Sequence, residues 1–208
     1  MTINLKNLLN PNIKSSKMGE FQELGQIDGL SISSVSADLY GDGRDDLTLF
    51  YFKDGAKYAA IYTKSKITSC CINWNLRIKK FFIKALLVNT KNANTFTGIQ
   101  GAESIKEISK HLAKSLTLKA AQNPEGTKEV VKSTDLLFAS TGVIGEKFPT
   151  KKIKDRITYL IDKLKSEQNK FVWFKAASAI MTTDTRPKLA YEECKIGNKN
   201  IKISGIAK

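Results

Sequence analysis

The sequence is poor in the residues that build metal centres and disulfide frameworks. It contains a single histidine, His111, and three cysteines, of which Cys70 and Cys71 are adjacent and Cys194 is distant. One imidazole cannot supply a His-rich zinc site, and no Cys-x-x-Cys pair is present. Unpaired thiols of this kind are typical of a reducing compartment. The composition therefore predicts a protein with no metal site.

Long apolar runs are also missing. No run approaches the roughly 18–20 residues that are needed to cross a bilayer, and the longest, residues 81–88, is interrupted by Lys84. Residues 1–17 contain neither an uninterrupted apolar core nor a small-residue cleavage site, and they lack arginine. These absences disfavour secretory and mitochondrial targeting signals. They predict a cytoplasmic protein that does not associate with membranes.

Arginine is scarce, although the chain is strongly basic. The formal net charge is +14, supplied by 30 Lys and only 4 Arg. Nucleic-acid recognition favours the bidentate guanidinium group, and the lysines are spread along the chain instead of clustering with aromatic residues. A basic nucleic-acid-binding module is therefore an alternative that the composition disfavours. A solvated basic surface explains the charge more simply.

What is present is the composition of a globular domain, with 41% hydrophobic and 26% charged residues in a chain of 208. Residues 1–24 are polar and are expected to form an irregular lead-in, whereas residues 25–208 form the folded part. Short β-like runs alternate with amphipathic segments in this part. The alternation predicts an α/β fold, a two-sheet layered sandwich with helices on its outer faces.

The expected elements follow from hydrophobic periodicity. Strands are expected at residues 30–35, 47–52, 85–88 and 136–139. Helices are expected at residues 103–117, 151–166 and 171–181, and His111 lies at the border of the first apolar stripe. Turn residues at 53–55 predict that residues 58–63 return as a hairpin partner of the second strand. The chain is expected to close with a hairpin of residues 188–195 and 201–208.

Three polar loops follow a buried strand or a helix, where active-site residues commonly lie. They are residues 89–98, 140–145 and 182–185. In the second loop, Gly142 and Gly145 allow close approach of the backbone, and consecutive N–H groups can hold an anion or oxyanion. Each loop also has a purely structural interpretation as a turn. The Asp- and Gly-rich residues 41–46 lack the spacing of a calcium loop and are interpreted as an acidic turn.

Several familiar catalytic motifs are absent. The sequence has no Gly-x-Ser-x-Gly elbow, no Walker loop and no Gly-x-Gly-x-x-Gly after a strand. A single histidine also disfavours a Ser-His-Asp triad. Acyl chemistry in this protein would therefore require a nucleophile activated in another way, for example a threonine assisted by an N-terminal amine.

Together the three loops resemble motifs of the ornithine acetyltransferase (glutamate N-acetyltransferase) family. Residues 86–98, LLVNTKNANTFTG, resemble its asparagine-rich motif, and residues 140–145, STGVIG, resemble its oxyanion-hole loop. Residues 179–188, AIMTTDTRPK, resemble its most distinctive stretch. The resemblance extends over about residues 25–208. Lys91 departs from the family, which usually has glycine at that position.

This resemblance implies a self-cleaving precursor. Family members cut themselves before a threonine, which becomes the N-terminal nucleophile of a second chain. The cut would lie beyond Lys208, so that this sequence corresponds to the α chain. The resemblance implies a β chain as its partner and an α2β2 heterotetramer as the assembly. By the same resemblance, Thr141 and Gly142 match oxyanion-hole positions, and Thr182 and Lys208 match substrate-binding positions.

The implied reaction is a ping-pong transfer of acetyl from N-acetylornithine to glutamate in arginine biosynthesis, without a cofactor. Some members also accept acetyl-CoA as a co-substrate, and the sequence leaves both kinds open. A related self-processing aminopeptidase is an alternative because it shares the N-terminal nucleophile. The stretch at residues 182–185 favours the acetyltransferase.

Overall fold

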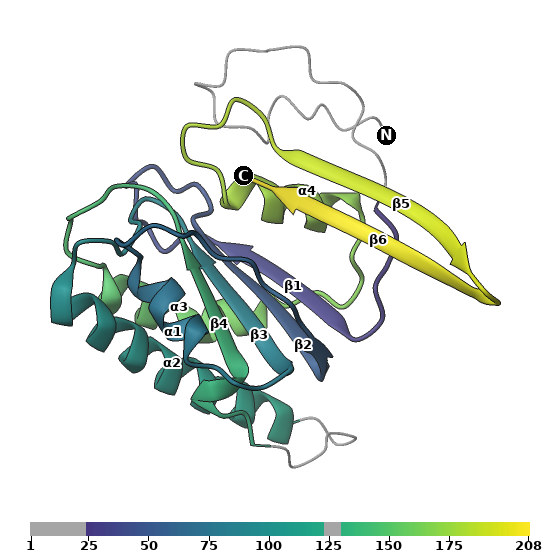
Figure 1. The fold of residues 1–208 in the computed structure, drawn as a ribbon, viewed down its shortest axis with the longest axis horizontal. Helices are drawn as coiled ribbons and strands as arrows, with labels where there is room; N and C mark the ends of the chain where they lie inside the picture. The colour runs from purple at the N-terminus through teal and green to yellow at the C-terminus, as the bar shows by residue number, and fades with distance from the viewer. Residues whose placement is uncertain (1–23, 123–129) are drawn as a thin grey trace.

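Four strands form one mixed sheet in the computed structural model, which describes residues 24–122 and 130–208. Its strands are β1 (Leu30–Val35), β2 (Leu47–Lys57), β3 (Phe82–Asn89) and β4 (Leu136–Ser140), in the order β1-β2-β3-β4. The first three are antiparallel neighbours, whereas β4 runs parallel to β3. The carboxyl ends of β3 and β4 therefore meet at the same end of the sheet (Figure 1).

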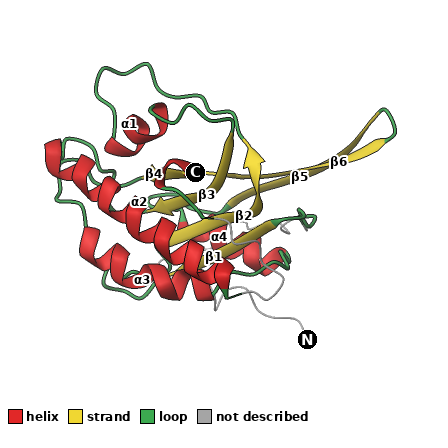
Figure 2. Cartoon of the chain, turned by 90° about the horizontal axis from the view of Figure 1, so that it is seen from below, coloured by secondary structure: helices red, strands yellow, loops and turns green. Residues whose placement is uncertain are grey.

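One face of this sheet is covered by α1 (Cys70–Leu76), α2 (Gly98–Ala121) and α3 (Thr150–Asp162) (Figure 2). The apolar stripes of α2 and α3 face inward, as their spacing predicts. The stripe residues with at most 1% exposure are Ile105, Ile108, Leu112, Leu116, Ile153, Ile157 and Leu160. Burying each such side chain contributes about 1.5–3 kcal/mol. The two helices are thereby fixed against the sheet.

The opposite face carries a second apolar cluster. Trp173 and Ala176 of α4 (Lys170–Ala179) pack there with Leu30 and Ile32 of β1. The closing hairpin, β5 (Lys188–Ile196) and β6 (Lys199–Ala207), adds partly buried side chains to the same cluster. Its far end projects beyond the rest of the molecule (Figures 1 and 2). The structure thus confirms a layered α/β arrangement with two sheets and the expected final hairpin.

Two expectations about local structure were wrong. Residues 58–63 do not return as a hairpin partner, because β2 continues to Lys57 and pairs with β3 instead. The register shifts between Tyr51 and Ala56, and Gly55 adopts φ 77° there, so the expected turn is a bulge inside one strand. Helix α3 ends at Asp162, a few residues before the expected end. The expected lead-in, apart from Leu24, lies outside the described residues.

Helix α1 was not expected, and it closes the outer edge of β4. The Asn75 side chain accepts a hydrogen bond from Phe138 N (3.0 Å) and donates one to Phe138 O (2.9 Å). The Trp74 indole donates to Leu136 O at 3.0 Å. These side chains take the place of a neighbouring strand and protect the edge from further pairing. Within the two described stretches, no helix has the length and apolar character needed to cross a bilayer.

Candidate active site

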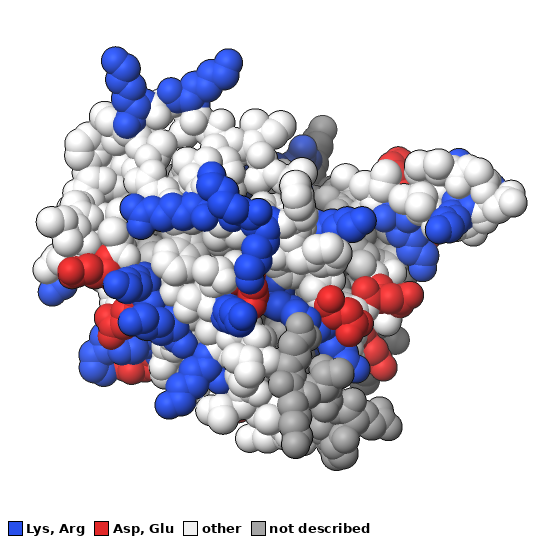
Figure 3. Space-filling model, turned by 60° about the horizontal axis from the view of Figure 1, so that its bottom comes forward, with Lys and Arg blue, Asp and Glu red and all other residues white. Residues whose placement is uncertain are grey.

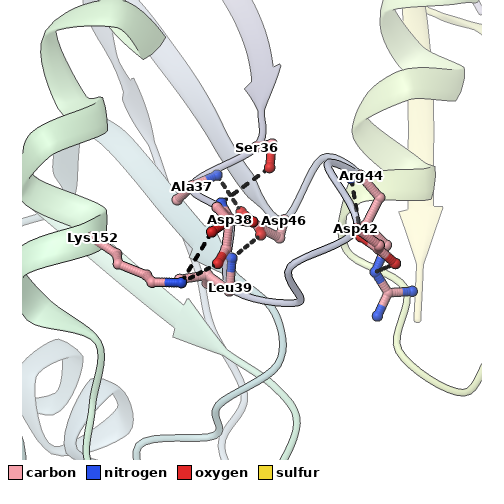
Figure 4. A network of polar contacts seen from close by, with 8 residues as sticks. All are labelled: Ser36, Ala37, Asp38, Leu39, Asp42, Arg44, Asp46 and Lys152. Carbon is pink, nitrogen blue, oxygen red and sulfur yellow. Dashed lines mark hydrogen bonds and ion pairs between the residues drawn. The ribbon is translucent and has the colours of Figure 1, made fainter.

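The acidic turn before β2 is held together by Asp46. Its buried carboxylate accepts hydrogen bonds from the backbone N–H groups of Ala37 and Leu39, both at 2.7 Å (Figure 4). Burial raises the pKa of this carboxyl, and the two hydrogen bonds offset only part of the effect. The carbonyl of Asp46 accepts the N–H of Thr90 at 3.0 Å. Asp46 therefore anchors the start of the asparagine-rich loop. Sequence reasoning treated it only as part of a turn.

The structure brings the first two polar loops together beyond the ends of β3 and β4. Thr141 N donates to Asn89 O (3.1 Å), and Val143 N donates to Lys91 O (2.8 Å). Ala93 N in turn donates to Val143 O at 2.9 Å. The parallel pairing of the two strands is thus extended into the loops. Residues 89–98 and 140–145 form one structural unit.

The asparagines of the first loop hold the main chain in place. Asn92 and Asn94 are 2% and 0% exposed. The Asn92 amide donates to the carbonyl of Glu146 at 3.1 Å, and Asn94 accepts the Thr97 hydroxyl at 2.7 Å and donates to the Gly101 carbonyl at 3.3 Å. Buried amides need such partners. These side chains therefore shape the loop and do not face a ligand.

Only glycine fits at position 142. Its φ of 135° lies in a region that side chains with a Cβ rarely adopt. An added Cβ would also lie 2.2 Å from the carbonyl carbon and oxygen of Lys91 and 2.7 Å from Asn92 N. The close approach of the two loops thus depends on this glycine.

Thr141 and Gly142 offer two hydrogen-bond donors at the end of β4. The backbone N–H groups of Thr141 and Val143 are engaged within the protein. Among the described residues, no partner bonds to the N–H of Gly142 or to the hydroxyl of Thr141. Thr141 is half-buried and Gly142 is exposed. The arrangement can stabilise a negatively charged oxygen placed against the turn.

The third loop forms a separate ionic cluster centred on Asp184. Its carboxylate accepts Lys188 Nζ at 2.5 Å, Lys208 Nζ at 3.1 Å and the backbone N–H of Thr182 at 3.3 Å. Burial on its own raises the pKa of Asp184, but the hydrogen bonds from the two lysines outweigh it and lower the pKa to about 2. The structure therefore brings Thr182 and Lys208 together. Sequence reasoning missed Asp184, the residue that joins them.

The two groups of candidate residues are not joined by polar contacts in the described part of the chain. No hydrogen bond or ion pair links Thr141 or Gly142 to Thr182 or Lys208 in the part of the chain that the structure describes. The C-terminal residue nevertheless lies toward the end of the sheet at which β3 and β4 finish (Figures 1 and 2). The two groups can therefore border one larger site.

The buried thiol of Cys71, beside the end of β4, is unsuited to nucleophilic chemistry. Cys71 is 1% exposed and is hydrogen-bonded to Ser140 Oγ at 2.9 Å. Burial raises its pKa to about 12, and the bond to Ser140 offsets only part of this rise. The reactive thiolate is therefore scarce at neutral pH. In residues 24–122 and 130–208, no group of three or more His, Cys, Asp or Glu side chains is placed to hold a metal ion.

The basic charge does not form a continuous stripe on the face shown in Figure 3. Lys and Arg side chains are interspersed there with acidic and uncharged ones. Several lysines also pair with acids, including Lys119 with Asp162 at 3.0 Å and Lys151 with Asp155 at 2.6 Å. This distribution on the visible face matches a solvated basic surface better than a nucleic-acid interface.

Lys91 occupies a conformation that favours glycine. Its φ of 71° is left-handed, which costs a residue with a Cβ roughly 1–2 kcal/mol. The strain is consistent with the glycine that the resemblance implies for this position. We expect Lys91→Gly to raise the free energy of unfolding by roughly 0.5–1 kcal/mol, since the added freedom of the unfolded chain cancels part of the gain. Chemical denaturation of the complete protein measures this.

The matched control for this substitution is Lys114→Gly. Lys114 is an exposed lysine inside α2, where glycine is expected to lower stability by about 1 kcal/mol. A Lys91→Gly variant that is destabilised like the control would contradict the role of backbone strain at Lys91.

The fold and the paired loops define a protein of the layered α/β class. It superposes with a TM-score of 0.75 on the arginine biosynthesis bifunctional protein ArgJ of Bacillus halodurans, at 22% identity, covering 89% of this chain and 93% of that one. The ornithine acetyltransferase of Mycobacterium tuberculosis, solved in complex with ornithine, gives a TM-score of 0.75 at 23% identity, covering 86% and 87%. At these identities the likeness concerns the fold. The chain belongs to the ArgJ family, whose model matches residues 31–208.

Curated relatives agree with this assignment. The arginine biosynthesis bifunctional protein ArgJ of Rhizobium meliloti is 33% identical over 189 residues, and that of Gluconobacter oxydans is 36% identical over 187 residues. The matches cover 90% and 89% of this chain but only 42% and 40% of the relatives. The chain thus spans about two fifths of the relatives' length. The resemblance to ornithine acetyltransferases is confirmed at the level of the family.

Proposed function

We propose that this chain is the N-terminal part of a glutamate N-acetyltransferase of arginine biosynthesis, which transfers acetyl from N-acetylornithine to glutamate. The observation that carries the proposal is the pair of unengaged donors on Thr141 and Gly142, held by the joined loops at the ends of β3 and β4. Membership of the ArgJ family supports the reaction, as do the names of the relatives and the ornithine bound to one solved neighbour.

In the proposed mechanism, the hydroxyl of a threonine outside residues 1–208 attacks the acetyl carbonyl of N-acetylornithine. The carbonyl oxygen becomes an oxyanion, which the Thr141 hydroxyl and the Gly142 N–H stabilise. Collapse of the tetrahedral intermediate breaks the C–N bond and releases ornithine with a proton on its amine, leaving an acetyl-threonine ester. The amine of glutamate then attacks this ester through a second oxyanion, and the threonine hydroxyl is regenerated.

Thr182 and Lys208 are assigned to substrate binding. An ammonium group has three N–H donors, and Lys208 uses one for Asp184. The remaining donors can bind the carboxylate that both N-acetylornithine and glutamate carry. No cofactor is required by this scheme. Acetyl-CoA would serve as an alternative donor if the enzyme also acts as an N-acetylglutamate synthase.

The proposed partner is a second chain that carries the nucleophilic threonine and is released from the same precursor by self-cleavage, in an α2β2 assembly. The coverage of the relatives supports this partner, because this chain spans 93% and 87% of the two solved chains but only 42% and 40% of the curated relatives. The buried thiol of Cys71 is a poor alternative nucleophile, because burial raises its pKa to about 12.

We expect residues 1–208 alone to show no acetyl transfer and co-production with the second chain to restore it, because oxyanion donors cannot form the acyl-enzyme without an activated nucleophile. The measurement is the glutamate-dependent release of ornithine from N-acetylornithine, together with mass spectrometry of the native protein. Two chains in equal amounts, the second beginning with threonine, are expected. Robust transfer by the 208-residue chain alone would refute the proposal. Peptide hydrolysis by the complete protein in place of acetyl transfer would favour the aminopeptidase alternative.

A further inference from the structure

A further cleft lies along the outer edge of β1, at the opposite edge of the four-stranded sheet from β4. Its volume is about 820 Å³, and its walls come from β1, the second half of α3 with the segment that follows it, and the first turns of α4. None of Thr141, Gly142, Thr182 and Lys208 lines it. The cleft is therefore separate from the proposed active site.

The cleft exists because β1 is only partly paired on its outer side. Ile32 exchanges two hydrogen bonds of 3.0 Å with Lys165, which forms an isolated bridge in place of a fifth strand. Beyond this bridge the edge of β1 faces the cleft, and Lys175 Nζ donates to Ser34 O at 3.1 Å. Between the bridge at Ile32 and the end of β1, a lysine side chain and not a neighbouring strand covers the edge in the described part of the chain.

Positive charge dominates the lining. Three structural segments contribute four cationic side chains, which are Arg156, Lys163, Lys165 and Lys175, against the two acids Asp45 and Glu167. Lys175 is paired with Asp45 at 3.1 Å. Among the residues that the structure describes, the other three cationic groups form no ion pair with an acidic side chain. An anion placed between them would meet charges that the protein itself does not neutralise.

A buried hydroxyl in the same wall also lacks a partner. Ser33 is 4% exposed, and its Oγ makes no hydrogen bond within the described stretches. The neighbouring serine hydroxyls are engaged, since Ser34 Oγ bonds Thr48 Oγ1 at 3.0 Å and Ser36 Oγ accepts Asp38 N at 3.0 Å. Buried hydroxyls normally have a partner. The Ser33 hydroxyl is itself buried, so the charged groups of the lining are the ones that a ligand in the cleft would meet first.

We propose that this cleft is a binding site for a phosphorylated small molecule of nucleotide size. Phosphate oxygens suit the planar fork of Arg156, one of only four arginines in the chain, and the point charges of Lys163 and Lys165. The volume lies within the roughly 300–1,000 Å³ range of small-molecule sites. Tyr159 and Phe171 also line the cleft, and Lys163 Nζ lies over the Tyr159 ring at 5.1 Å from its centre.

The test is isothermal titration calorimetry of the complete native protein at about 50 mM salt, with pyrophosphate, ADP and coenzyme A titrated in separate experiments. We expect saturable binding of at least one of these probes, weakening as the salt concentration rises. The Arg156→Gln/Lys165→Gln double variant should bind at least about tenfold more weakly, since two charge-assisted hydrogen bonds are lost. If pyrophosphate binds as tightly as ADP, the phosphate groups alone are recognised. If only ADP or coenzyme A binds, the organic part is required.

The matched control is Lys114→Gln/Lys151→Gln, which removes the same charge from exposed positions of α2 and α3 that do not line the cleft. It should bind the probe like the native protein. Thermal unfolding of both double variants establishes that they are folded. The proposal is overturned if the native protein binds none of the three probes, if the two double variants bind equally, or if citrate binds as tightly as pyrophosphate. None of these readouts depends on acetyl transfer, so the site and the proposed function can fail separately.

Discussion

Replacing Thr141 with alanine in the complete enzyme is expected to lower kcat by about 10²–10³-fold, the usual effect of losing one oxyanion donor. The KM should change little, because the donor acts on charge that develops only in the transition state. Stability should also change little, since the Thr141 hydroxyl has no partner among the described residues and its removal leaves no hydrogen-bonding group unsatisfied. Steady-state kinetics and thermal unfolding of the same preparations separate these effects.

Two variants serve as controls for this prediction. Thr141→Ser keeps the hydroxyl and should recover most of the lost turnover. Thr158→Ala removes an exposed hydroxyl from α3, away from the loops, and should behave as the native enzyme. A Thr141→Ala variant with native kcat, or one whose turnover serine does not recover, would show that the hydroxyl is not an oxyanion donor.

The sequence predicted those elements that have a clear period and a buried face. Strand β3 and helix α2 include the predicted ranges and extend beyond them by one to five residues at each end, because burial of one face fixes the centre of each element better than its ends. Helix α1 has only seven residues, and its existence depends on contacts with β4 that lie 62 and 63 residues away in sequence. The local turn residues at 53–55 were misleading. Pairing with β3 carries β2 through Gly55 as a bulge, and no local pattern reports that pairing.

The candidate site was predicted in its parts but not in its assembly. The loops at residues 89–98 and 140–145 were both selected for their composition, and the parallel pairing of β3 and β4 joins them. The roles within the loops could not be predicted in the same way. The asparagines Asn92 and Asn94 are buried against the main chain, whereas the N–H of Gly142 is left available. The role of Asp184 was not predicted, because the sequence contains many lysines and no pattern marks Lys188 and Lys208 as its partners.

The second prediction of large effect concerns Lys208. We expect Lys208→Ala to raise the KM for both glutamate and N-acetylornithine by about 10–100-fold, since a hydrogen bond to a charged group contributes about 1.5–3 kcal/mol. The kcat should change less, because the substrate carboxylate keeps its charge throughout the reaction. The matched control is Lys188→Ala, which removes the other ammonium group on Asp184 and leaves Lys208 in place. Its KM values should stay within about twofold of the native ones. Unchanged kinetics in the Lys208 variant would refute the assignment.

Asp184 should act as a positioning residue for Lys208. Its side chain is 10% exposed and its pKa is lowered to about 2, so the carboxylate is charged at every pH at which the enzyme is assayed. Because its pKa is lower in the folded protein than in the unfolded chain, where it is near 3.9, Asp184 stabilises the folded state at every pH above about 3.9. This contribution to stability disappears as the pH falls toward 2. Between pH 5 and 8, titration of Asp184 should therefore contribute no pH dependence to the KM for glutamate. The Asp184→Asn variant should show the same shape of pH profile as the native enzyme. The same variant should raise this KM at all these pH values, because a neutral amide no longer balances the two ammonium groups and Lys208 loses its fixed position. An Asp184→Asn enzyme with the native KM would show that Lys208 binds substrate without this support.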